Sequence, residues 1–89
     1  MDILKIYKRS IKYRNRKISN RIILMGMRNN FEINEVGNFI WDHLDGKTTI
    51  DSIINLTSQE YDSSKDVIEK DVIDFIKFLC EKEVIEEVM

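Results

Sequence analysis

The sequence contains no proline, one cysteine, one histidine and only three glycines among its 89 residues. The lone Cys80 excludes an internal disulfide and leaves no cysteine cluster for zinc or an iron–sulfur centre, so we predict neither metal nor cofactor. Nothing marks a linker, and we expect residues 1–89 to form one domain. No apolar run approaches the ~20 residues that span a bilayer, and Met1–Tyr7 lacks the apolar core of a secretory signal. We therefore expect a cytoplasmic protein with no membrane partner.

Groups suited to catalysis are also scarce. The only histidine, His43, falls on the apolar stripe of a predicted helix, which favours a packed side chain over a general base. Cys80 has acidic neighbours that disfavour its thiolate. Pairs of carboxylates such as Asp71 and Asp74 are typical of a solvated helix surface, because nothing in the sequence supplies a polar pocket around them. We predict no catalytic residue and a protein that is not an enzyme.

Charge is divided unevenly along the chain. Residues 1–30 hold nine Lys/Arg and one acid, whereas residues 31–89 hold five Lys and fifteen Asp/Glu, so the two parts carry charges of +8 and −10. Such polarity can orient the approach of a charged partner. Most of the acidic excess lies in the predicted helices, which would have to enter the groove of a nucleic acid, and we therefore predict no nucleic-acid partner.

The first third of the chain has the patterns of strands. Ser10–Arg14 and Phe31–Asn34 alternate apolar with polar residues, and Ile22–Met25 is a compact apolar run. Gly26 and the Asn29–Asn30 pair supply turn residues between the second and third stretches. We expect a small antiparallel meander of three strands.

After Asn34 the apolar period becomes helical. Asn34 is placed to cap a first helix, and the Asp45–Gly46 pair to end it, because glycine readily adopts the left-handed conformation of a helix end. A second helix should follow at once, capped by Thr48 or Thr49. The residues expected on the buried faces of these two helices are Val36, Phe39, Ile40, His43 and Leu44, then Ile50, Ile53, Ile54, Thr57 and Tyr61.

A third helix, capped by Ser63, should follow and end near Glu83. Its central apolar stripe is Ile68, Val72, Phe75, Ile76 and Leu79. The segment Val84–Val88 alternates only in part and is either a last strand or a frayed tail. The sequence thus predicts an α+β fold in which a three-stranded antiparallel sheet is followed by three helices.

One set of residues carries a resemblance to a known family. It consists of Phe31-Glu32-Ile33-Asn34-Glu35-Val36-Gly37, Ile40-Trp41, Leu44-Asp45-Gly46, Ile53, Asp71-Val72, Phe75-Ile76 and Leu79. In order and spacing this set resembles the PqqD family over about Ser10–Ile85, and the resemblance implies a winged helix-turn-helix fold. Ile33 stands where leucine is commoner, Glu83 replaces a frequent glycine, and the basic segment Lys5–Lys17 is not a family hallmark.

The resemblance also implies a function. PqqD-like proteins are recognition elements for ribosomally made, post-translationally modified peptides: they hold the leader segment of the precursor for a modifying enzyme, such as a radical-SAM peptide cyclase or a leader peptidase. The leader adds a strand to the third strand and lays side chains beside the third helix. Carried onto this chain, the peptide-binding residues are Asn29, Asn30, Phe31, Glu32 and Ile33 at the edge, and Val67, Asp71, Asp74, Phe75 and Phe78 in the groove.

The residues themselves leave alternatives open. An exposed strand edge suits peptide addition, because main-chain groups supply affinity, but a short polar edge also occurs without a ligand. Phe78 lies on the same flank of the third helix as Val67 and the two aspartates, and it would either contact a peptide or cover the rim of the core. The rival functions are a winged-helix DNA-binding regulator and a structural subunit that pairs its open edge with its own copy.

Overall fold

The computed structural model describes residues 1–88. Within these residues the strands are β1 (Ile6–Arg9), β2 (Arg14–Ile18), β3 (Arg21–Met25), β4 (Asn30–Ile33), β5 (Asp45–Thr49) and β6 (Ile85–Val88). The helices are α1 (Glu35–Asp42), α2 (Ile50–Glu60) and α3 (Lys65–Glu81). The fold is α+β with antiparallel sheets and three helices, as the sequence predicted, and the last segment is a strand, β6.

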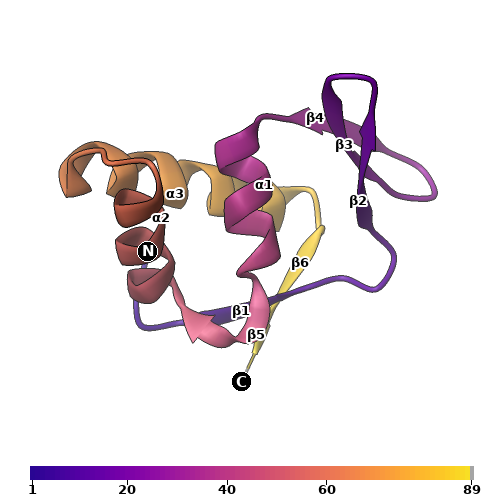
Figure 1. The fold of residues 1–89 in the computed structure, drawn as a ribbon. Coiled ribbons are helices and arrows are strands. Elements are labelled where there is room, and N and C mark those ends of the chain that lie inside the picture. The colour runs from indigo at the N-terminus through magenta and orange to yellow at the C-terminus, as the bar shows by residue number, and fades with distance from the viewer. Residues whose placement is uncertain (89) are drawn as a thin grey trace.

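The strands form two separate sheets instead of the one that we predicted. One sheet has the order β2-β3-β4, and the other has the order β5-β1-β6. Figure 1 shows the β2-β3-β4 sheet projecting to one side of the helices, while β1, β5 and β6 lie below α1 and α2. The second sheet joins the two ends of the chain, because β1 pairs with β6 through four residue pairs from Ile6↔Val88 to Arg9↔Ile85.

The predicted strand Ser10–Arg14 is wrong. Residues 10–13 form a turn between the two sheets, in which the Tyr13 amide donates to the Ser10 carbonyl at 3.2 Å. The Ser10 amide in turn donates to the carbonyl of Val84 at 3.0 Å. The apolar alternation was misleading here because Ile11 is fully exposed. The first strand of the meander is instead β2, whose residues are all exposed.

Two of the three predicted helix caps are confirmed. The Asn34 side chain accepts from the Gly37 amide at 2.7 Å, and the Thr49 hydroxyl accepts from the Ser52 amide at 3.1 Å. The third cap was placed one residue too early, because the residue before α3 is Ser64, whose side chain makes no capping bond.

The predicted helix stop at Asp45–Gly46 is also wrong. Helix α1 ends at Asp42 with His43 as its cap, and β5 separates it from α2. Gly46 does adopt a left-handed conformation, with φ of 80°, but it does so within β5. The Asp45 carboxylate accepts from the amides of Lys47 and Thr48, both at 2.9 Å, so this pair shapes a turn instead of a helix end.

The core lies between the inner faces of the three helices and the strands that contact them. Trp41 is 2% exposed, and the predicted stripes of α2 and α3 are buried except at Tyr61 and Phe75, which are half-buried. Each large apolar side chain buried in this way contributes about 1.5–3 kcal/mol. Met27, by contrast, is 93% exposed in the β3–β4 loop.

Candidate functional site

Strand β4 presents an open edge. Among the described residues it pairs with β3 alone, in a register that runs from Ile22↔Ile33 to Met25↔Asn30. The Gly26 amide donates to the Asn29 carbonyl at 3.0 Å. Hydrogen-bonded pairs alternate in an antiparallel ladder, so Phe31 and Ile33 bond to β3 while the main-chain groups of Asn30 and Glu32 face the open side.

The side chains of β4 divide between the two faces of the sheet. Phe31 and Ile33 are half-buried against the core, and Asn30 and Glu32 are exposed, as their alternation predicted. The Glu32 carboxylate lies 3.7 Å from the guanidinium of Arg21 on the neighbouring strand, and both groups are largely exposed. An incoming strand would therefore meet free main-chain groups and a weak surface ion pair.

Helix α3 forms the wall beside this edge. The Phe78 ring meets the Phe31 ring edge-on, with 5.5 Å between centroids, and Phe75 packs against Gly37 together with Ile33. Phe78 is 36% exposed. The structure thus brings two of the predicted groove residues, Phe75 and Phe78, onto the predicted edge.

The other predicted groove residues extend along α3 beyond these contacts. Asp71 and Asp74 are exposed, and Val67 is 59% exposed. Val67 lies three helical turns before Phe78, about 16 Å along the axis, so no part of the short strand β4 covers it. These three residues share a flank with Phe78 but do not contact the edge.

Sequence reasoning missed a hollow next to Asn29. It has a volume of about 1050 Å³, and its lining includes Lys12, Tyr13, Met27, Arg28 and Lys82. The Tyr13 ring stacks on Phe31 with 6.4 Å between centroids, and the Lys82 ammonium lies 5.9 Å from the centre of the Phe78 ring. No signal in the sequence joins these residues, because they come from two turns and a helix end.

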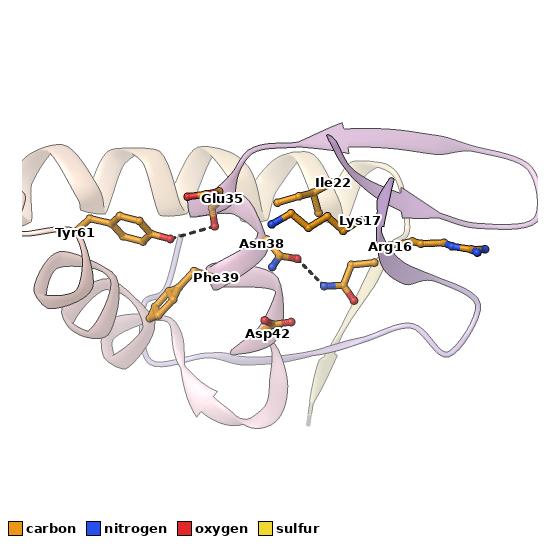
Figure 2. Close-up of a pocket in the computed structure, with 9 residues that line it drawn as sticks. Arg16, Lys17, Ile22, Glu35, Asn38, Phe39, Asp42 and Tyr61 are labelled. Atoms are coloured by element: carbon orange, nitrogen blue, oxygen red, sulfur yellow. Dashed lines mark hydrogen bonds between the residues drawn. The ribbon is translucent and has the colours of Figure 1, made fainter. Parts of the chain in front are cut away.

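A second hollow, of about 310 Å³, separates β2 from α1 (Figure 2). The Asn15 amide donates to Asn38 at 2.6 Å across it, and the Tyr61 hydroxyl donates to the Glu35 carbonyl at 3.2 Å. Figure 2 shows Lys17 lying on the α1 side of β2 while Arg16 points away from the helix. This hollow lies beside the opposite edge strand from β4, and its Asn15–Asn38 bond links the projecting sheet to α1.

Neither the single histidine nor the single cysteine is placed for a catalytic role. The His43 Nδ1 is hydrogen-bonded to the Phe39 carbonyl at 2.8 Å at the end of α1. Burial raises the pKa of the Cys80 thiol, and Glu87 adds to the effect. The acids next to Cys80 in the sequence are therefore not the cause of the raised pKa. No three His, Cys, Asp or Glu side chains gather as metal ligands within residues 1–88. In the same residues, no helix has the length and apolar character needed to cross a membrane.

Comparisons with known proteins place this geometry in a family. The structure of TbiB1 in complex with the TbiA(beta) leader peptide has a TM-score of 0.74 and 26% identity, over 89% of this chain and 94% of that chain. The solution structure of the PqqD truncation of Methylobacterium extorquens PqqCD, a stand-alone RiPP recognition element, has a TM-score of 0.77 and 23% identity, over 91% and 88%.

A search of curated proteins gives no significant match. The family model for coenzyme PQQ synthesis protein D matches residues 21–85, which starts later than the Ser10 that we expected and begins with β3. That model covers most of the chain, including the β4 edge and the whole of α3. The chain belongs to the PqqD family.

Proposed function

We propose that this protein binds the leader segment of a ribosomally made precursor peptide as an added strand on β4, and that it holds this leader for a separate modifying enzyme without catalysing a reaction itself. The observation that carries the proposal is the open edge of β4 beside the exposed ring of Phe78. The likeness to TbiB1, whose structure contains a leader peptide, supports it.

In binding of this kind, main-chain groups provide the affinity and side chains provide the sequence selectivity. The outward main-chain groups of Asn30 and Glu32 would pair with the leader whatever its sequence, as they do in other complexes formed by strand addition. Side chains of the leader that point toward α3 would contact Phe75 and Phe78, while Asp71 and Asp74 would favour a basic residue. The site that we propose consists of the residues expected from the family resemblance: Asn29, Asn30, Phe31, Glu32, Ile33, Val67, Asp71, Asp74, Phe75 and Phe78.

The benefit to the partner enzyme is one of effective concentration. A leader held at a fixed place makes the encounter of the rest of the precursor with the active site nearly intramolecular. A radical-SAM peptide cyclase and a leader peptidase both fit this arrangement, because the cyclase acts on the part of the chain beyond the leader and the peptidase cleaves the bond where the leader ends.

A winged helix-turn-helix is the description of the fold that we favour, with α2 and α3 as the paired helices and β3–β4 as the wing. In DNA-binding proteins of this shape the second helix of the pair enters the major groove. Helix α3 carries five acids, Asp66, Glu69, Asp71, Asp74 and Glu81, against three lysines, so its approach to a polyanion is unfavourable. This charge favours the peptide over DNA as the ligand.

The test is calorimetric titration with synthetic front halves of the short peptides encoded beside the gene. We expect a Kd of about 1 μM, a free energy of about −8 kcal/mol. Glu32→Pro should weaken binding at least about tenfold, because proline removes an outward N–H and places its ring on the open edge. Phe78→Ala should weaken binding as well.

Two controls make this test specific. Glu32→Ala keeps the amide and should leave the Kd nearly unchanged. Lys17→Pro makes the matching change on β2, the other edge strand of the same sheet, where the main-chain groups of Lys17 also face outward. Equal losses from Glu32→Pro and Lys17→Pro would contradict binding at β4. Salt-sensitive DNA binding without any peptide binding would overturn the proposed function.

A further inference from the structure

We propose that the groove selects the charge order of its leader: a basic residue first and an acidic residue four or six positions later, with apolar side chains between them. This inference rests on the proposed function and specifies its ligand. It comes from opposite charges at the two ends of the strip of α3 that faces β4.

The strip consists of four residues that share one side of α3. Asp71, Phe75, Phe78 and Lys82 follow one another at intervals of four, three and four, which is helical spacing. The two aromatic residues fix the direction of the strip, since Phe75 packs beside Ile33 and Phe78 beside Phe31. Asp71 therefore lies beyond the Ile33 end of β4, and Lys82 lies at its Asn29 end.

The Asn29 end carries positive charge from three separate segments. Lys12, Arg28 and Lys82 all line the hollow at this end. Two carboxylates also line it, Glu83 and Glu86, and the second already lies 3.8 Å from the ammonium of Lys8. The cations remain in excess, and the whole segment 10–29 contains six Lys/Arg and no acid.

The opposite end is negative and its charges are not neutralised. Asp71 and Asp74 are exposed on consecutive turns of α3. None of the ion pairs formed within residues 1–88 includes either aspartate or Lys82. These groups are therefore free to pair with charges on a peptide, and each end repels a peptide that presents the same sign.

Direction and spacing follow from strand geometry. An added strand pairs best antiparallel to β4, so its chain would run from the Ile33 end toward the Asn29 end. Asp71 and Lys82 are eleven residues apart, about 16.5 Å along the helix axis. A strand covers this distance in about five residues, and only alternate side chains of the strand face α3, so the two charged residues should be four or six positions apart. The leader would thus present its basic residue to Asp71 and its acidic residue to the hollow, in that order.

The experiment uses the full chain and a yeast-displayed library of random 14-residue peptides, sorted for binding to the labelled protein. Binders whose capture is lost with Glu32→Pro define the edge-bound set. In this set we expect Lys or Arg to be enriched four or six positions before Asp or Glu. Synthetic pairs with the two charges exchanged should differ in Kd by about fivefold to tenfold, as two exposed charge contacts together provide.

A charge-reversed protein supplies the decisive comparison. The double variant Asp71→Lys/Lys82→Glu keeps the net charge and reverses the strip, so its edge-bound peptides should show the opposite order. The double variant Lys47→Glu/Glu60→Lys exchanges the same charges on exposed positions of β5 and α2, and it should keep the original order.

The outcomes separate the two proposals. Edge-dependent binders with no charge order, or with the acidic residue first, would overturn this inference and leave the proposed function standing. A library without any binder sensitive to Glu32→Pro would overturn both. An order that inverts in the reversed strip and not in the control would establish that these two charges select the leader.

Discussion

Replacing Glu83 by glycine should stabilise the protein, because Glu83 has a backbone conformation that suits glycine. Its φ is 59°, in the left-handed region. It follows the C-cap of α3, where its amide donates to the Cys80 carbonyl at 3.1 Å and the Val84 amide donates to the Leu79 carbonyl at 3.0 Å. These two bonds form a Schellman motif, and Leu79 and Val84 are fully buried, as that motif favours.

The expected change in the free energy of unfolding is the difference between two opposing contributions. A residue with a β-carbon in this conformation costs about 1–2 kcal/mol, and glycine gives back about 0.5–1 kcal/mol through the greater freedom of the unfolded chain. Glu83→Gly should therefore raise the free energy of unfolding by about 0.5–1 kcal/mol, and the Tm by about 2–8 °C for a chain of this size. Urea unfolding should show a higher midpoint with an unchanged slope.

The neighbouring residue provides the control. Lys82 has φ of −89°, so Lys82→Gly relieves no strain and should lower stability by about 0.5–1 kcal/mol. If Glu83→Gly destabilised the protein as much as Lys82→Gly, the backbone at residue 83 would not be strained. A left-handed backbone at residue 83 would then not explain why glycine is frequent at this position in the family.

Two further predictions concern the turn after β3 and the half-buried thiol. An added methyl group at Gly26 would lie 2.7 Å from Cζ of Tyr13, so Gly26→Ala should cost about 1–3 kcal/mol in urea unfolding, and much less when Tyr13 is already alanine. Equal losses in both backgrounds would show that the Tyr13 ring is not the obstacle. Because burial raises the pKa of Cys80, iodoacetamide should reach its half-maximal rate at a higher pH in the folded protein than in urea. The free energy of unfolding should accordingly fall as the pH rises past the ordinary thiol pKa, since the unfolded thiol loses its proton first; identical alkylation profiles would contradict this.

The sequence by itself determined where α1 and α2 begin and which faces α2 and α3 bury, while the predicted edge came from the family resemblance. Local rules suffice for these features: Asn34 and Thr49 cap the helices that follow them, and apolar spacing marks the faces that α2 and α3 bury. The alternation in Phe31–Ile33 likewise fixed which side chains face the core. The resemblance to the PqqD family rested on this region, and the family model matches it.

Tertiary structure decided the second sheet, because its three strands come from distant parts of the chain. Strand β1 is paired with β6, roughly 80 residues away, and no local pattern encodes a contact at that separation. The same pairing turned Ser10–Tyr13 into a turn, since the Ser10 amide bonds to Val84.

Tertiary structure also decided the chemistry at the Asn29 end of the groove. Lys12, Arg28 and Lys82 belong to two turns and a helix end, so only the packing of α3 against β4 brings their charges together. Composition shows that the chain is basic at one end and acidic at the other. The fold places the two signs at opposite ends of the strip of α3 that faces β4, because α3 runs antiparallel to this strand.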